Sequence, residues 1–231
     1  MRRTLVVALA LVAVVNAPAA AQTCQGLASF STGQMQVAGN AQFGEIANTF
    51  GGSFSYGVPS GVYGGLDLST TSFDNDLGSS LGVGAHAGYQ MKLGQAGRVH
   101  LCPVARLALG MGPDDEAADI NASSTDVHFG LALGTEMGAN PKMRILPTAG
   151  LGLQYSKAKV EDTSPGGTTL EGSETYALAR LGVGFVFNQQ ISVRPSIDIP
   201  LGSDISSDPA FGLTLSYNFG KTGVAPARSR R

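Results

Sequence analysis

The chain has 231 residues, a formal net charge of −2 at pH 7 and no tryptophan. Its 32 glycines are about twice the share found in an average protein, and no segment beyond the N-terminus shows an apolar stripe at helical spacing. Many strands joined by tight turns are therefore favoured over helices. The lack of a basic patch interleaved with aromatic residues excludes a typical nucleic-acid-binding surface.

The first residues predict export. Arg2 and Arg3 form a basic start, an apolar stretch runs from Leu5 to Val15, and small alanines follow. The apolar stretch is shorter than the ~18 residues expected of a spanning helix, so it fits a secretory signal peptide. We expect residues 1–21 to be removed by cleavage before Gln22.

Alternation of apolar with small or polar residues predicts the strands of the mature chain. Each predicted strand is followed by a stretch rich in glycine, proline or polar residues, as turns require. The ten strands that we expect are 34–43, 49–58, 61–72, 80–93, 98–111, 125–137, 143–156, 175–187, 191–201 and 209–219.

Short and long connections alternate between these strands. The short ones lie near Pro59, Gly94, Gly138 and Asn188, and the longest of the others covers residues 157–174. Strict alternation over an even number of strands is typical of outer-membrane barrels, which have short periplasmic turns and longer external loops. We therefore predict an all-β fold, a transmembrane up-and-down antiparallel β-barrel of ten strands, with eight strands as the alternative.

One face of every predicted strand is suited to lipid. In residues 209–219, for example, aromatic residues and leucines alternate with glycine, threonine, serine and asparagine. A charge at the bilayer centre would cost about 2–4 kcal/mol, so a membrane barrel excludes charges from that face. The ionisable residues of the strand interiors all fall on the opposite face: Asp67, His86, Arg106, His128, Glu136, Arg180, Arg194 and Asp198.

The two ends of the predicted barrel differ in chemistry. Most of the 17 acidic residues lie in the long connections, whereas the short turns and the tail carry basic residues such as Lys92, Lys142 and Arg228. Aromatic residues gather toward both strand ends and leave an aliphatic band between them, as expected of two membrane interfaces.

A proline lies near the start of three predicted strands, at Pro103, Pro147 and Pro195, with spacings of 44 and 48 residues. Proline cannot donate a hydrogen bond to a strand ladder. We place each proline on the lipid face near the periplasmic rim, where bulges and strand starts tolerate the missing N–H group.

The signal peptide, the strands of the form P-x-A-x-L-x-L after short turns and the closing strand FGLTLSYNFG resemble the small outer-membrane β-barrel superfamily, the opacity-protein-like and OmpW-like barrels. The resemblance implies an outer-membrane monomer that contacts lipid, lipopolysaccharide and the barrel-assembly machinery. Such barrels commonly end on the aromatic residue of the last strand, whereas here Phe219 is followed by a further segment. We expect residues 22–33 to form an N-terminal periplasmic segment, 34–220 the barrel and 221–231 a basic, disordered tail.

The inward charges allow two interpretations of the barrel interior. Arg106, Arg180 and Arg194 can face Asp67, Glu136 and Asp198 across the lumen, and a three-residue turn after residue 187 would place Arg180 opposite Asp198. The charges then neutralise one another and fill the barrel, which is the interpretation that we favour, or they line a narrow pore for a small solute.

The chain has two cysteines, Cys24 near the mature N-terminus and Cys102 on the predicted inward face. In an exported protein such a pair usually oxidises, although two free thiols are the alternative. A disulfide between them would hold the N-terminal segment at the periplasmic mouth.

We therefore predict a non-enzymatic barrel, either structural and surface-interacting or a narrow passive pore, with no cofactor, no metal site and no nucleic-acid partner. An outer-membrane enzyme is the first alternative, because Asp126 and His128 share one strand face, but no nucleophile accompanies them. A soluble periplasmic ligand-binding β-barrel is the second, although its apolar rows would then face water.

Overall fold

The computed structural model describes residues 23–27, 34–45, 47–58, 61–73, 78–93, 99–112, 120–137, 142–162, 164, 167–203 and 208–219. The predicted signal peptide, most of the segment 22–33 and the tail 221–231 lie outside these residues. Among the residues described, no helix is both long and apolar enough to span a membrane.

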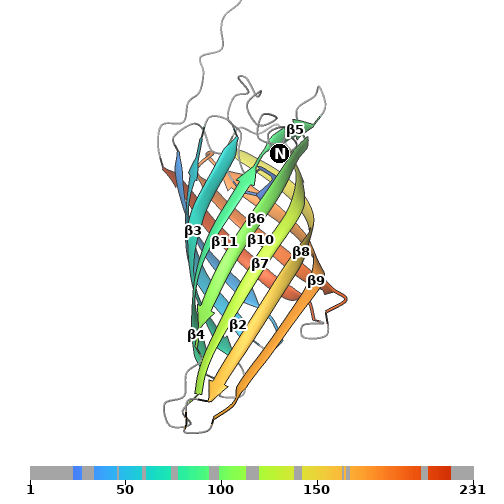
Figure 1. Cartoon of the computed structure of the whole chain (residues 1–231). Helices are drawn as coiled ribbons and strands as arrows, with labels where there is room; N and C mark the ends of the chain where they lie inside the picture. Colours follow the sequence, from blue (N-terminus) through green and yellow to red (C-terminus); the bar gives the residue numbers. More distant parts are fainter. Residues whose placement is uncertain are drawn as a thin grey trace, which may run out of the picture.

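One antiparallel sheet closes on itself to form a barrel (Figure 1). β1 pairs with β11 and β4 pairs with β6, while β5 continues the line of β4 beyond Gln90, so the wall consists of ten strands. The predicted ten-stranded up-and-down barrel is thus confirmed, and eight strands would be too few. The strands are β1 (Met35–Phe43), β2 (Ala47–Gly57), β3 (Val62–Phe73), β4 (Ser79–Tyr89), β5 (Met91–Leu93), β6 (Val99–Met111), β7 (Ile120–Thr135), β8 (Met143–Asp162), β9 (Thr169–Phe187), β10 (Ile191–Leu201) and β11 (Ala210–Phe219).

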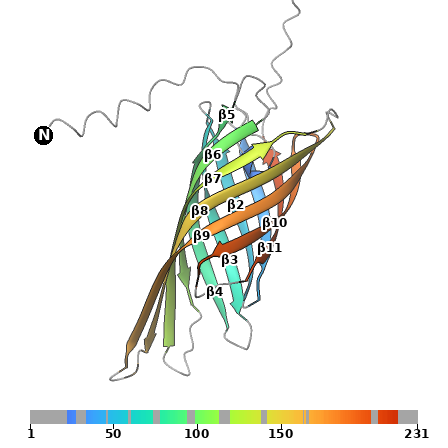
Figure 2. The ribbon, with the colours of Figure 1, turned by 90° about the vertical axis from the view of Figure 1, so that its right-hand side faces the viewer.

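The barrel has two distinct rims. We call the end where β1 begins and β11 ends the terminal rim, and the opposite end, where β1 turns into β2, the loop rim. At the loop rim the tips of β7, β8 and β9 extend beyond the other strands (Figures 1 and 2). In Figure 1 the terminal rim is at the top and the loop rim at the bottom.

The predicted strict alternation of short and long connections is wrong in two places. β1 and β2 are joined by only residues 44–46, and most of the expected loop 157–174 is strand, because β8 continues to Asp162 and β9 begins at Thr169. This extension carries polar side chains on both faces, including the ion-paired Lys157 and Glu171. Because this hairpin lacks the alternation of apolar and polar residues that predicts membrane strands, its sequence resembles that of a loop.

The outer surface of the wall is apolar and the inner surface is small or polar. Leu66 and Phe129 point outward and are 65% and 63% exposed. Such exposure suits a lipid-facing surface and would be unfavourable in water. The alternation in the sequence predicts that the ionisable residues of the strand interiors face the inside of the barrel. Seven of them line the cavity inside the barrel, and the eighth, Glu136, lies at the terminal rim, as described below.

Each of the three prolines lies beside an interruption of the ladder. Pro103 pairs with β7 on one side, and on the other it faces the break at Gln90 between β4 and β5. Pro147 lies just outside the β7–β8 ladder, and Pro195 occupies a gap in the β9–β10 ladder. Because proline has no N–H group to donate, it fits these positions at little cost.

Candidate functional site: the lumen and its closed end

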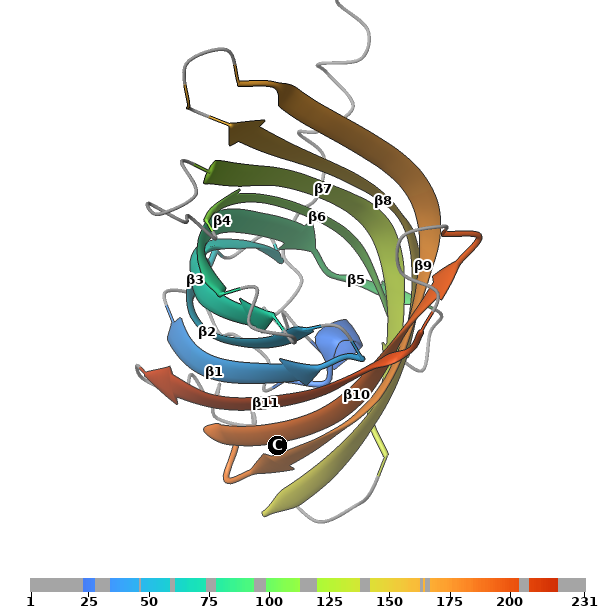
Figure 3. The same ribbon diagram turned by 90° about the horizontal axis from the view of Figure 1, so that it is seen from below.

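Residues 23–27, which we call the inner turn, lie inside the barrel near the terminal rim. Figure 3 shows this short blue turn within the ring of strands. It includes the 3-10 turn η1 (Thr23–Gln25), and Cys24 and Leu27 are both buried. A disulfide joins Cys24 to Cys102 of β6, so the inner turn is attached covalently to the wall.

Three hydrogen bonds from different parts of the wall also hold the inner turn. The amide of Thr23 donates to Oε1 of Gln90 at 3.0 Å, and Nε2 of Gln25 donates to the hydroxyl of Tyr63 at 2.6 Å. Nη1 of Arg194 donates to the carbonyl oxygen of Gln25 at 2.8 Å. Gln90 and Tyr63 are far from the inner turn along the chain, so no local sequence pattern predicts these contacts.

Two wall glycines leave space for the inner turn. A methyl group on Gly184 of β9 would overlap the carbonyl oxygen of Gly26, and one on Gly134 of β7 would overlap the backbone of Thr23 and Cys24. Gly26 itself has φ of +69°, a conformation that residues with a side chain rarely adopt. The wall is therefore shaped to the backbone of this segment.

The packed core of the described chain lies at this end of the barrel. Side chains from strands all around the wall become inaccessible here, next to the inner turn, whereas the lumen above is open. The most deeply buried of them are Gln36, Tyr63, Cys102, Leu146, Val186, Ser192, Ser216 and Asn218.

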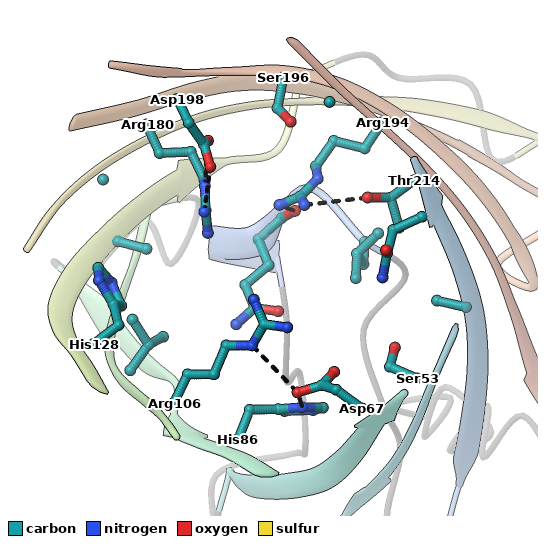
Figure 4. Close-up of a pocket in the computed structure, with 18 of the residues that line it drawn as sticks. Ser53, Asp67, His86, Arg106, His128, Arg180, Arg194, Ser196, Asp198 and Thr214 are labelled. Atoms are coloured by element: carbon teal, nitrogen blue, oxygen red, sulfur yellow. Dashed lines mark hydrogen bonds and ion pairs between the residues drawn. The ribbon is translucent and has the colours of Figure 1, made fainter. Parts of the chain in front are cut away.

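Above the inner turn lies a polar cavity of about 230 Å³, which we call the vestibule. Its floor includes Cys24, Gln25 and Leu27, and its lining reaches Gln42 and Thr49 close to the loop rim. Figure 4 shows charged side chains from opposite walls projecting into it. The vestibule thus extends from the closed terminal rim toward the loop rim.

Arg180 of β9 and Asp198 of β10 form the best-aligned ion pair of the vestibule. Nε of Arg180 donates to Oδ1 of Asp198 at 2.6 Å, and Nη2 donates to Oδ2 at 2.5 Å. Nε2 of Gln42 also donates to this carboxylate, at 3.3 Å. Two parallel bonds to one carboxylate fix both the position and the orientation of the arginine.

Asp67 of β3 is the centre of a second polar cluster. Its Oδ2 lies 3.1 Å from Nδ1 of His86 and 3.4 Å from Nε of Arg106. Nε2 of His86 in turn lies 2.9 Å from the hydroxyl of Ser55. The cluster links four strands of the lumen wall, β2, β3, β4 and β6, and Figure 4 shows Asp67 between His86 and Arg106.

Glu136 lies apart from the other predicted lumen charges. β7 ends at Thr135, and Glu136 lies beyond it at the terminal rim, where it accepts a hydrogen bond from Nη1 of Arg144 at 3.2 Å. The strand was expected to run to residue 137, but only an isolated bridge at Met137 continues the pairing. The arginines of the vestibule therefore have no contact with this glutamate.

The pair considered for an enzyme does not form a catalytic contact. Asp126 accepts hydrogen bonds from Ser156 at 2.6 Å and from Gln154 at 3.3 Å. Nδ1 of His128 is buried and has no hydrogen-bond partner among the described residues. In this part of the chain there is also no group of three or more His, Cys, Asp or Glu residues placed to hold a metal ion.

The sequence profile of the family described as "Outer membrane protein beta-barrel domain" matches residues 7–219. The chain belongs to this family of outer membrane barrels. Membership agrees with the resemblance seen in the sequence and places the protein in the outer membrane. No curated protein matches the chain.

Solved structures resemble this outer membrane barrel in fold at low sequence identity. The translocator domain of the autotransporter NalP from Neisseria meningitidis is 11% identical, with 84% of this chain and 90% of that domain covered and a TM-score of 0.52. Ail of Yersinia pestis is 14% identical, with 81% and 99% covered and a TM-score of 0.42. The N-terminal β-barrel domain of OprF from Pseudomonas aeruginosa is 13% identical, with 81% and 98% covered and a TM-score of 0.37.

Proposed function

We propose that this protein is an outer-membrane barrel closed at its terminal rim, with a structural and surface-interaction role rather than that of an open passive pore. The observation that carries the proposal is the position of the inner turn. A disulfide from Cys24 to Cys102 ties it to the wall, and it fits against Gly134 and Gly184. A water path through the barrel would have to pass this packed end.

The charges of the lumen support the same proposal. Asp198 takes both donors of Arg180, and Asp67 is engaged by His86 and Arg106. A charged side chain that is paired with its neighbour offers little free charge to a passing ion. These pairs therefore favour a filled lumen over a conducting one. The alternative, a narrow passive pore for small solutes, requires these pairs to open and the inner turn to leave.

The loop rim is the part suited to interaction outside the membrane. β8 and β9 are 20 and 19 residues long, whereas a tilted strand crosses a bilayer with about 9–11 residues. Their outer parts therefore extend into water and carry charged residues such as Lys157, Lys159 and Glu171. This projecting sheet is the surface that we assign to contacts with lipopolysaccharide or other molecules of the cell exterior.

Export and assembly follow from the same proposal. Cleavage before Gln22 would leave a single residue ahead of the inner turn, so the seated turn would be the mature N-terminus. The terminal rim would then face the periplasm, as short turns do in bacterial barrels. We propose that the barrel is inserted by the barrel-assembly machinery and functions as a monomer surrounded by lipid and lipopolysaccharide.

A non-enzymatic role is part of the proposal. Asp126 is occupied by Ser156 and Gln154 rather than orienting His128. A histidine without an orienting carboxylate and a hydroxyl to activate lacks the arrangement that nucleophilic catalysis requires.

Planar-bilayer recording of the purified mature chain tests the closed barrel. We expect no discrete conductance steps from the wild type, and steps from a variant that lacks residues 22–33. The single variant Cys24→Ser, which keeps the whole chain, should show intermittent openings because the inner turn is then held by non-covalent contacts alone. Folding of each variant is checked by the shift in electrophoretic mobility between unheated and boiled samples.

Steady conductance of the wild type, equal to that of the shortened variant, would overturn the closed barrel and favour the narrow pore. Thiols can also be counted in wild-type protein that is purified without reductant and then denatured. Two free thiols would show that Cys24 and Cys102 are not joined by a disulfide. Either result leaves the barrel fold unaffected.

A further inference from the structure

The described lining of the vestibule carries an excess of positive charge. Three arginines, Arg106, Arg180 and Arg194, face two aspartates, Asp67 and Asp198. Arg180 and Asp198 neutralise one another through two hydrogen bonds. Asp67 is then left with two positive charges, those of Arg106 and Arg194, and can neutralise only one of them.

Of the three vestibule arginines, Arg194 is the one that has no ion pair with a carboxylate among the described residues. Its Nη1 donates to the carbonyl oxygen of Gln25 at 2.8 Å, and its Nη2 donates to Oγ1 of Thr214 at 3.3 Å. Both acceptors are neutral, and Nε of Arg194 is buried without a partner in the described part of the chain. Within the described chain, the positive charge of this guanidinium is therefore stabilised only by neutral polar groups.

Arg106 keeps its two terminal amino groups free of hydrogen bonds to the described residues. Only its Nε approaches Asp67, at 3.4 Å, and 49% of the side chain is exposed. Figure 4 shows Arg106 and Arg194 reaching from opposite walls toward the middle of the lumen. An anion between them would meet donors from two sides.

His128 lies beside Arg106 on the neighbouring strand. The two residues are directly opposite each other in the β6–β7 ladder, and both face the vestibule. Nδ1 of His128 is buried without a partner among the described residues. The imidazole of His128 therefore makes the wall beside Arg106 polar.

We propose that the vestibule is a binding site for a small organic carboxylate that enters from the loop rim. Arg106 supplies the main contact through its terminal amino groups. Arg194 adds the uncompensated positive charge near the floor. Guanidinium groups bind carboxylates in a planar, two-point geometry, and the cavity of about 230 Å³ has room for an acid of a few carbon atoms. The site adds a ligand to the closed barrel but does not require the terminal rim to be shut.

Calorimetric titration of the purified mature chain in detergent micelles tests this site. Succinate is the probe, and succinamide, which has the same carbon skeleton without charge, is the control ligand. We expect saturable binding of one succinate per barrel and no saturable heat with succinamide. Binding of both compounds alike, or of neither, would overturn the proposal.

Matched variants locate the site. Arg106→Gln should weaken succinate binding at least tenfold, since a hydrogen bond to a charged group is lost. Lys157→Gln removes the same charge from the projecting hairpin and should leave the affinity unchanged. Equal effects of the two variants would show that succinate responds only to net charge, which contradicts the proposed site.

A measurement on the wild type covers the case in which Arg106→Gln fails to fold. In a 15N spectrum, succinate should shift the Nε–H signal of Arg106 saturably and leave that of Arg144 in place. A shift confined to Arg144 would place the anion at the terminal rim and overturn the vestibule site. None of these readouts depends on conductance, so the closed barrel and the carboxylate site stand or fall separately.

Discussion

Arg180 and Asp198 are direct neighbours on β9 and β10, joined by two parallel hydrogen bonds of 2.6 and 2.5 Å. The turn between these strands fixes the pairing. Asn188 and Gln189 both have positive φ, +47° and +59°, and the amide of Gln190 donates to the carbonyl oxygen of Phe187 at 3.0 Å. So tight a turn sets which residues face each other along the whole hairpin.

Truncation of Asp198 should destabilise the barrel, because it leaves Arg180 unpaired in the lumen. We expect Asp198→Ala to lower the free energy of unfolding by about 1–2 kcal/mol, between the values for exposed and buried ion pairs. Urea titration in lipid vesicles measures the change. The control is Glu171→Ala, which breaks the exposed ion pair with Lys157 and should cost much less, because water screens that pair. Equal losses would contradict a specific role for the lumen pair.

Loss of the disulfide should lower stability more strongly. Cys24 and Cys102 are 78 residues apart, and constraint of a loop of that length in the unfolded chain is worth about 4 kcal/mol in the chain-entropy model. We expect the double variant Cys24→Ser, Cys102→Ser to unfold at clearly lower urea concentration than the oxidised wild type. The reduced wild type is the control and should match the double variant. Identical midpoints for all three proteins would contradict the expectation.

Added volume at Gly184 should displace the inner turn. A methyl group there would overlap the backbone of Gly26, and overpacking of this kind costs about 1–3 kcal/mol. We expect Gly184→Ala to raise amide hydrogen exchange in residues 23–27 about tenfold or more. Gly150→Ala is the control, since its new methyl group would lie 3.5 Å from the nearest atom, the carbonyl oxygen of Leu131. Protection that stays the same in both variants would show that the turn is not seated against β9.

The loop rim should show a pH-dependent contact between two acids. Protonated Glu45 donates a hydrogen bond to Asp208, and the negative charge of Asp208 repels the charge of ionised Glu45. Both effects raise the pKa of Glu45 above the usual range. The folded state therefore holds this proton more tightly than the unfolded chain does. Its contribution to stability is complete below the ordinary glutamate pKa and is lost as pH rises through the raised value.

An NMR titration of the side-chain carboxyl signals checks the pH dependence. Asp208→Asn removes the repelling charge and should return the midpoint of Glu45 toward its ordinary value. A midpoint of Glu45 at or below the ordinary glutamate value in the wild type would contradict the predicted proton sharing.

The strands of the barrel wall and their two faces could be predicted from the sequence, because a strand exposes alternate residues to opposite sides. Lipid excludes charge from one side, so Arg180, Asp198 and Asp67 had to face the lumen wherever the strand ends lay. The opposition of Arg180 and Asp198 also followed from a local feature, the length of one turn. The projecting hairpin of β8 and β9 could not be predicted in this way. Water lies on both of its faces, so its sequence has no alternation of apolar and polar residues.

Only the tertiary structure decided how the barrel is closed at its terminal rim. The inner turn meets Gln90, Tyr63, Gly134 and Gly184, which come from strands that are neighbours of residues 23–27 only after the sheet has closed. No local pattern records such contacts, because they depend on the curvature and register of the whole wall. The sequence by itself thus determined a lipid-facing barrel with a charged interior, and closure of the sheet determined that the interior is a vestibule with a floor.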